Sequence, residues 1–193
     1  MENIGKYRVI KELGKGATAT VYLCDDPDQD RQVAVKVIQF GSDSNAMSRR
    51  MRKLFLNEGM VAKRLNHPNI VRIYDAVVED DFAYLAMEFL EGESLRTRLL
   101  RVRQLSEAVT VRIGRQIASG LATAHASQVV HRDLKPENIF MVPDAEAPSG
   151  ERAKILDFGI ANHTCDFSVG NWRFLFVIGK CLGIPQRRGI RAD

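Results

Sequence analysis

Alternating apolar and polar residues run through the first forty positions of the chain. Three segments carry the pattern: YRVIKEL, TVYLC and QVAVKVIQF, within residues 7–40. They are rich in β-branched side chains, and the breaks between them are Gly14-Lys15-Gly16 and a polar run at 25–31. Period-two alternation bounded by turn residues is typical of half-buried strands. The sequence therefore predicts three antiparallel strands joined by tight turns.

The pattern then changes to a helical period. Residues 45–66 have apolar side chains spaced among arginine, lysine and glutamate, and His67-Pro68 ends the segment. Such spacing predicts an amphipathic helix, and proline is a stop signal. The remaining elements expected are strands at 70–78 and 82–89, helices from Ser94 and over 106–127, a loop at 131–138, a strand at 139–142, a turn-rich insert at 143–150 and a strand at 154–156. The order predicts an α+β protein, with a sheet lobe joined through residues 88–92 to a helical lobe.

Composition narrows the class of protein. The 193 residues are 45% hydrophobic and 27% charged with a formal net charge of +4, which is typical of a globular domain without a nucleic-acid-binding patch. Cys24, Cys165 and Cys181 show no CxxC spacing, so neither a zinc site nor a disulfide framework is expected. The N-terminus lacks the apolar core of a signal peptide, and no run of about 18 apolar residues predicts a membrane span. We therefore expect a cytoplasmic protein.

Two features of the sheet lobe suggest a phosphate-binding site. Gly14 and Gly16 lie on a turn between strands, where backbone N–H groups can approach phosphate oxygens without an intervening Cβ. Glycines in a hairpin also occur for the turn alone. Lys36 lies within an apolar run and needs an anionic partner, for which Glu58 and an ATP phosphate are the candidates. The alternative is a lysine that extends to the solvent at a sheet edge.

The strongest signal is the run HRDLKPEN at 131–138, followed by Asp157-Phe158-Gly159. Asp133 can accept the proton of an attacking hydroxyl, and Lys135 can neutralise charge on a transferred phosphoryl group. Asn138 and Asp157 offer oxygen ligands to Mg²⁺. A charged surface loop would not explain both motifs together. The set predicts phosphoryl transfer from Mg²⁺–ATP to a hydroxyl.

These motifs resemble those of the eukaryotic-type (Hanks-type) serine/threonine protein kinase family, in particular its bacterial members. The resemblance covers residues 7–161 and implies a two-lobed kinase-like fold, ATP and Mg²⁺ as cofactors, and protein substrates with serine or threonine hydroxyls. It assigns the catalytic set Asp133, Lys135, Lys36 and Glu58; the nucleotide-binding set Leu13, Gly14, Gly16, Val21, Ala34, Lys36, Glu88, Leu90, Asn138 and Asp157; and the metal ligands Asn138 and Asp157. The backbone of residues 88–90 would bond adenine, next to Met87.

The resemblance also implies a division of the chain. Residues 1–90 are expected to form the nucleotide-binding lobe, 91–161 part of the catalytic lobe, and 162–193 a tail unlike the family. Ala19 replaces the third glycine of the loop, and no Ala-Pro-Glu motif follows residue 161. Three interpretations of the tail stay open: a truncation or reading-frame change, a terminus that binds a partner, and membrane-surface contact through the apolar residues within 172–178.

Without the later helices of the family, the catalytic loop would lack part of its support, which predicts weak or absent activity for this chain. The alternative function is that of a non-catalytic kinase fragment that binds nucleotide or a partner. A small-molecule kinase is disfavoured because Lys135 and the run DLKPEN resemble protein kinases.

Overall fold

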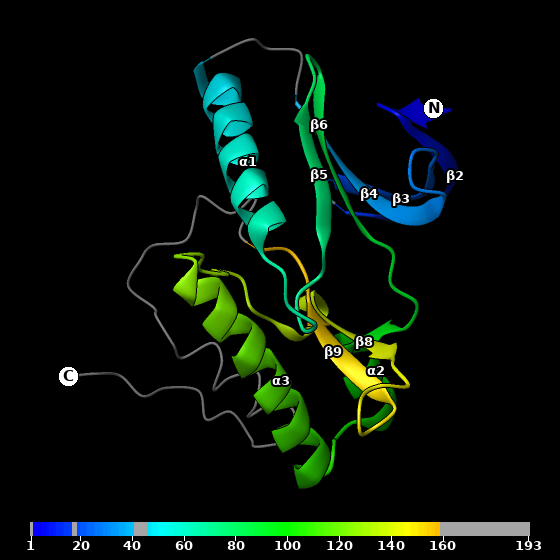
Figure 1. Ribbon diagram of the computed structural model, residues 1–193, viewed down its shortest axis with the longest axis vertical. Helices are drawn as coiled ribbons and strands as arrows, with labels where there is room; N and C mark the ends of the chain where they lie inside the picture. The colour runs from blue at the N-terminus through cyan, green and yellow to red at the C-terminus, as the bar shows by residue number, and fades with distance from the viewer. Residues whose placement is uncertain (1, 17–18, 41–45, 159–193) are drawn as a thin grey trace, which may run out of the picture.

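The computed structural model describes residues 2–16, 19–40 and 46–158, and in its first helix the side chains at 46–51, 54 and 58 lie outside the described part. The expectations for the tail at 162–193, and for residues 159–161, also lie outside it. Figure 1 shows two lobes, a sheet with one long helix above and a smaller helical lobe below. This is the α+β layout expected from the sequence.

The upper lobe is a six-stranded antiparallel sheet in the order β1-β2-β3-β4-β6-β5. Its strands are β1 (Asn3–Ile4), β2 (Tyr7–Lys15), β3 (Ala19–Asp26), β4 (Arg31–Gln39), β5 (Ile73–Val78) and β6 (Phe82–Glu88). The three strands expected within 7–40 are confirmed. The two-residue β1 was not predicted, because two residues are too few to show a period. The strand expected from residue 70 begins only at Ile73.

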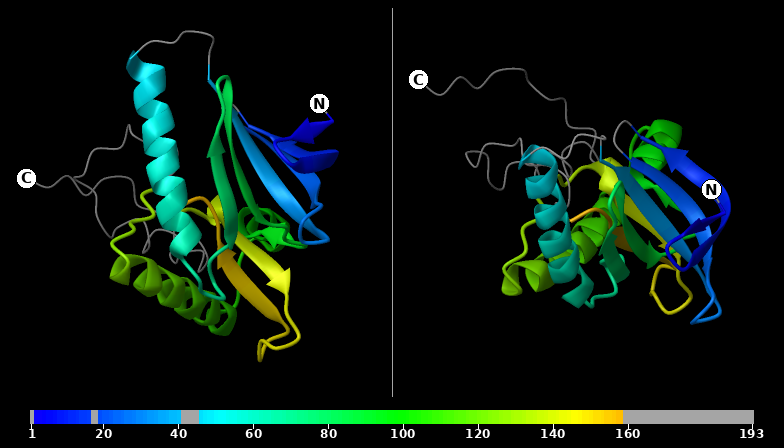
Figure 2. Two further views of the ribbon diagram at one scale, coloured as in Figure 1. Left: turned by 45° about the horizontal axis from the view of Figure 1, so that its top comes forward. Right: turned by 90° about the horizontal axis from the view of Figure 1, so that it is seen from above.

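The helix α1 (Ala46–Arg64) lies along one face of this sheet, as the views in Figure 2 also show. A Cβ added at Gly59 would come within 2.7 Å of the Ala76 Cβ atom and 3.2 Å of Leu85. The backbone of α1 therefore approaches β5 and β6 as closely as only glycine permits. This packing brings the helix that carries Glu58 against the sheet that carries Lys36.

The burial of β4 explains where Lys36 points. Val33, Val35 and Val37 pack in one apolar cluster with Tyr7 and Tyr84. The alternate residues Ala34 and Ile38 pack in another, which includes Phe55 and Ala62 of α1. Because successive side chains point to opposite faces of a sheet, Lys36 lies on the face shared by Ala34 and Ile38. The lysine thus faces the α1 side of the sheet, not its outer edge.

The lower lobe contains helices α2 (Leu95–Val102) and α3 (Glu107–Ala126), the 3₁₀ turn η1 (Pro136–Asn138), and a sheet of β7 (Glu93–Ser94), β8 (Ile139–Pro143) and β9 (Glu151–Ile155). Both helices begin at a serine cap, as the sequence indicated for the second: the Oγ atom of Ser94 accepts from the N–H of Thr97, and that of Ser106 from Val109. Of the helices described, none is long and apolar enough to cross a membrane.

The strand expected at 154–156 is longer and starts earlier than predicted. It begins at Glu151, pairs with β8 along its whole length and ends at Ile155. The reason is the turn at 144–150, where the N–H of Asp144 donates to Gly150 O (2.9 Å) and its carboxylate accepts from the N–H of Glu146 (2.9 Å). This tight turn lets β8 and β9 form a hairpin.

Besides the connecting segment at residues 88–92, which we call the hinge, polar contacts join the two lobes. Asn69, in the turn after α1, donates through Nδ2 to Ala153 O (2.8 Å) and to Gln116 Oε1 (3.2 Å). The same Gln116 oxygen accepts from the N–H of Ala153 (2.6 Å). Ile70 also bridges to Ile155, and the N–H of Ile155 donates to Asn69 O (2.9 Å). The end of β9, which leads into Asp157, is thus fixed to both lobes.

Gly120 allows α3 to approach this junction. A Cβ there would lie 3.0 Å from Ile155 and 3.2 Å from the carbonyl of Asn69. We expect Gly120→Val to destabilise the protein by about 1–3 kcal/mol through overpacking. The control Ala122→Val places the same side chain on the exposed face of α3. Urea unfolding of both variants measures the difference, and equal stabilities would contradict the close packing.

Candidate active site

The loop at 131–138 is anchored by a buried histidine. His131 is 2% exposed, and its Nε2–H donates to Leu156 O (2.7 Å). Its Nδ1 atom accepts from the N–H of Asp133 (3.3 Å), and its ring lies 4.8 Å from that of Phe158. The neutral imidazole therefore connects the loop that carries Asp133 to the segment that carries Asp157. The sequence alone did not indicate a role for His131 or Leu156.

Asp133, Lys135 and Asn138 converge as predicted. The Asn138 Nδ2 atom donates to the Asp133 carbonyl (2.8 Å) and to the Oδ2 atom of its carboxylate (3.2 Å). The Lys135 Nζ atom lies 2.7 Å from the same Oδ2 atom. The turn η1, which begins at a proline, brings Asn138 back under Asp133. The carboxylate is oriented from two sides, which suits a group that must receive a proton in one direction.

Lys36 has its anionic partner in Asp157. The Lys36 Nζ atom lies 2.7 Å from the Asp157 Oδ1 atom, and the two side chains are 20% and 39% exposed. The sequence predicted Glu58 and an ATP phosphate as partners of Lys36; the pair with Asp157 was not predicted, and it tests neither of the other two. Asp157 adopts a φ of 52°, which turns the chain after β9 so that this contact can form. Glu58 belongs to α1, but its side chain lies outside the described part, and its pairing stays a prediction.

The two expected metal ligands are held on neighbouring segments. The N–H of Leu156 donates to Asn138 O (2.8 Å), which ties the residue before Asp157 to the end of η1. Because the Asn138 amide nitrogen donates to Asp133, the amide oxygen is the atom that can face a cation. No group of three or more His, Cys, Asp or Glu side chains within the described ranges could hold a metal. One carboxylate and one amide oxygen fit Mg²⁺, which binds few protein ligands and completes its shell with phosphates and water.

Most of the expected adenine-binding residues share an apolar cluster. Ala34 and Met87 are buried in it, and Val21, Leu90 and Leu156 pack against it. Leu156 was not among the residues expected in this cluster, although its position directly before Asp157 could have indicated that it lies there. Leu13 is 42% exposed and is not part of the cluster, so its role stays a prediction.

The glycines of the turn at 14–16 have few neighbours among the described residues. A Cβ at Gly14 would meet no atom within 4 Å, and one at Gly16 only the carbonyl of Ala19 at 3.5 Å. Packing within the described protein therefore does not require glycine at position 14. A glycine at position 14 is consistent with close approach of a phosphate to the backbone of the turn.

The hinge residue Glu88 is more constrained than expected. Its N–H donates to Arg72 O (2.8 Å), and its carboxylate pairs with the Lys154 Nζ atom (2.8 Å). The N–H of Glu88 is therefore already bonded within the protein. Among the backbone groups of residues 88–90, the N–H of Glu88 is not available to adenine. The other groups, including those of Leu90, remain the predicted partners.

The buried histidine gives a pH-dependent prediction. Burial lowers the pKa of His131 from its ordinary 6.5, although the bond to Leu156 opposes this. The unfolded chain then binds more protons than the native one below pH 6.5, so stability is present above that pH and is lost as the pH falls. We expect His131→Asn to reduce the slope of unfolding free energy between pH 6.5 and 5.5 by up to about 1.4 kcal/mol per pH unit. Urea unfolding across this range measures the slope, and an unchanged slope would be inconsistent with a neutral buried imidazole.

The chain is similar in sequence to a known protein family and to several curated proteins. The family model described as "Protein kinase domain" matches residues 7–168. The chain is 39% identical over 186 residues to serine/threonine-protein kinase PrkC of Bacillus subtilis, covering 96% of this chain and 27% of that protein. It is 39% identical over 182 residues to serine/threonine-protein kinase pkn2 of Myxococcus xanthus, covering 94% and 21%. It is 38% identical over 162 residues to PkaB of Streptomyces coelicolor, covering 81% and 37%. The chain thus spans between 21% and 37% of the length of these curated relatives.

Proposed function

Because the chain belongs to the protein kinase family, we propose that its site serves the ATP-dependent phosphorylation of serine and threonine hydroxyls in proteins. The observation that carries the proposal is the convergence of two lysine–carboxylate pairs, Lys36 with Asp157 and Lys135 with Asp133, on one buried anchor, His131. One pair suits the phosphates and the metal, and the other suits the reacting hydroxyl.

In this mechanism each side chain has one task. Asp133 orients the substrate hydroxyl and accepts its proton during in-line attack. Lys135, already beside that carboxylate, stabilises negative charge on the transferred phosphoryl group. Lys36 contributes its charge to the nucleotide phosphates, while Asn138 and Asp157 would hold Mg²⁺. Mg²⁺ held by these two residues would supply positive charge that stabilises negative charge developing on the transferred phosphoryl group.

The two lobes differ in their proposed roles. We assign nucleotide binding to residues 1–90 and catalysis to 91–161. The apolar cluster of Ala34, Met87 and Leu156 supports an adenine site, since a flat apolar base favours such a surface. We propose a preference for serine and threonine over tyrosine because the run at 133–138, with Lys135, resembles the serine/threonine branch of the family, and because the relatives carry the name serine/threonine-protein kinase.

A phosphotransfer assay tests the proposal. Purified chain is incubated with Mg²⁺–ATP labelled at the γ-phosphate and a generic protein substrate, and the labelled amino acids are separated after hydrolysis. We expect weak labelling, found in phosphoserine and phosphothreonine, and no label with Lys36→Met. Nucleotide binding without any transfer would favour the alternative, a non-catalytic nucleotide-binding kinase fragment.

A further inference from the structure

A cavity lies at the hinge, where it is lined by residues 88–91, and shares only hinge residues with the candidate nucleotide site. Its volume is about 610 Å³ and it is open to solvent on one side. Its lining comes from three places: the start of β4 and the turn after α1 (Gln32, Pro68), the hinge (Glu88, Phe89, Leu90, Glu91), and the β8–β9 hairpin (Val142, Pro143, Asp144, Glu146, Arg152, Lys154). Glu88, Phe89 and Leu90 also belong to the hinge segment that is predicted to bond adenine through its backbone. We call this cavity the hinge groove.

The charges of the hinge groove are unbalanced. Four carboxylates line it against two cationic side chains. Both cations are already paired: Lys154 with Glu88 at 2.8 Å, and Arg152 with Asp144. The two remaining carboxylates, Glu91 and Glu146, are exposed. The groove therefore presents a net negative charge that is not neutralised by its own lining.

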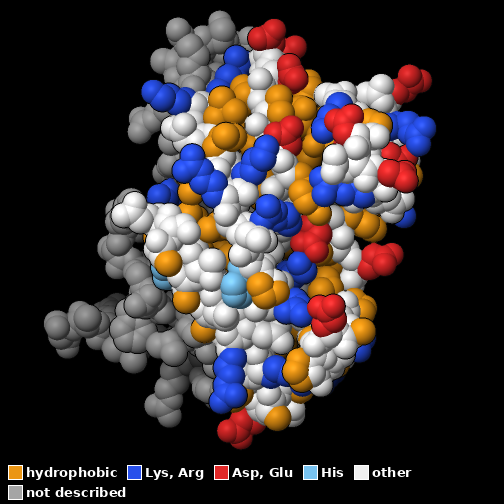
Figure 3. All heavy atoms as spheres, in the orientation of Figure 1, with side chains coloured by type: hydrophobic (Ala, Val, Ile, Leu, Met, Phe, Trp, Pro, Cys, Tyr) orange, Lys and Arg blue, Asp and Glu red, His pale blue; other side chains and the backbone are white. Residues whose placement is uncertain are grey.

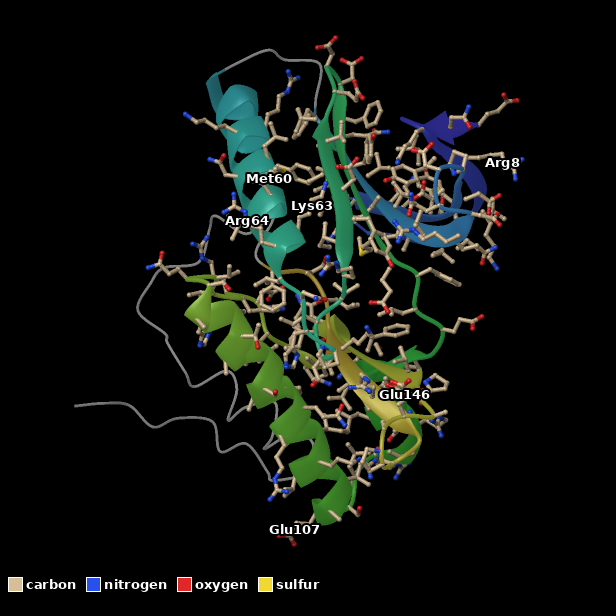
Figure 4. All side chains as sticks on the ribbon, in the orientation of Figure 1. Arg8, Met60, Lys63, Arg64, Glu107 and Glu146 are labelled. Atoms are coloured by element: carbon tan, nitrogen blue, oxygen red, sulfur yellow. The ribbon has the colours of Figure 1, made fainter. Side chains whose placement is uncertain are left out.

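Apolar surface lies between these carboxylates. Phe89 and Leu90 on the hinge are partly buried, and Val142 is 8% exposed beside Pro143. Figure 3 shows this arrangement: acidic side chains stand apart along the right-hand middle of the molecule, with hydrophobic side chains between them. Figure 4 places Glu146 on the turn beside β8 and β9. A surface on which acidic and apolar side chains alternate is complementary to a ligand on which basic and apolar groups alternate.

Hydrogen bonds, an ion pair and two prolines constrain the walls of the groove. The hairpin turn is held by the bonds of Asp144 to Gly150 and Glu146, and two prolines, Pro68 and Pro143, line the cavity. The carboxylate of Glu88 is fixed by Lys154 and by the N–H of Arg72 (3.3 Å). A preformed groove costs little to order on binding, so even a short segment could bind specifically.

We propose that the hinge groove docks an extended segment of a protein partner in which basic side chains flank an apolar one. The basic side chains would pair with Glu91 and Glu146, and the apolar side chain would contact Phe89 and Val142. Electrostatic complementarity of this kind selects partners and speeds association. The groove is lined by both lobes, so a docked segment would hold Gln32 and the β8–β9 hairpin together across the hinge. This binding does not depend on phosphotransfer by the chain.

The test uses the whole chain and a short fluorescein-labelled peptide that alternates arginine and leucine. We expect saturable binding by anisotropy, and no binding of the same peptide with glutamate in place of arginine. The double variant Glu91→Lys/Glu146→Lys should weaken binding at least about tenfold. Glu79→Lys, a single charge reversal on the exposed β5–β6 turn, should leave the affinity within about twofold, because rim charges act locally at physiological salt.

Mg²⁺–ATP should not displace the peptide, which separates the groove from the active site. Displacement, equal weakening by Glu79→Lys, or unchanged binding by the double variant would each overturn the proposal. Thermal melting checks that the variants fold. If charge reversal prevents folding, Glu91→Gln/Glu146→Gln makes the same comparison with smaller change in charge, and unchanged affinity there would again overturn it.

Discussion

Asp133→Asn is expected to reduce phosphotransfer by about 10²–10⁴-fold, the usual contribution of a positioned general base. The amide keeps the shape of the carboxylate but cannot accept the proton of the substrate hydroxyl. It also removes the negative partner that lies 2.7 Å from the Lys135 Nζ atom. The affinity for ATP should change by no more than about twofold, because the proposed nucleotide contacts come from Lys36 and Asp157.

The comparison needs rates and affinities for the same preparations. Initial rates come from labelled phosphate incorporated into protein, and ATP affinity comes from titration calorimetry. Glu107→Gln is the matched control: it removes a carboxylate at the opposite end of α3 from the catalytic loop (Figure 4). A variant at Asp133 that kept the full rate would rule out its role as base.

Asp157→Asn is expected to abolish the effect of Mg²⁺ on nucleotide binding. Asp157 is the one carboxylate of the proposed metal pair, and the substitution also removes the ionic partner of Lys36. Loss of a residue that supports a metal ligand lowers metal affinity by about 10–100-fold. Loss of Asp157, which would contact the metal itself, should lower it by at least as much. ATP affinity in the presence of Mg²⁺ should then fall to the value measured with a chelator.

The control for this variant is a second lysine–carboxylate pair outside the site. Asp75 lies 3.2 Å from the Lys63 Nζ atom and joins β5 to α1. Asp75→Asn should leave the difference between Mg²⁺ and chelator intact. If Asp157→Asn kept that difference as well, the metal would bind elsewhere and the assignment would fail.

The sequence predicted most of the fold because the periods are strong where the elements are long. In β4 every residue from Val33 to Ile38 except Lys36 belongs to one of two buried clusters, one on each face of the sheet. Ser106 indicated where α3 begins, and the proline after His67 indicated where α1 ends. The loop at 131–138 was predicted because its residues are close in sequence and their chemistry needs little tertiary information.

The features that the sequence missed depend on distant contacts. Lys36 and Asp157 are 121 positions apart, so no local pattern could show that they pair. The bond from the N–H of Glu88 to Arg72, which narrows the hinge prediction, likewise arises from tertiary packing. The early start of β9 at Glu151 depends on the turn bonds of Asp144, which a polar insert does not reveal by composition alone.

The most direct test of the central claim is the thermal melting of the whole chain with ATP, with and without Mg²⁺. A ligand that binds only the native state raises its stability by mass action. We predict one cooperative transition that shifts upward with ATP, and further when Mg²⁺ is added. A transition that is indifferent to both would contradict a nucleotide and metal site built from Lys36, Asn138 and Asp157.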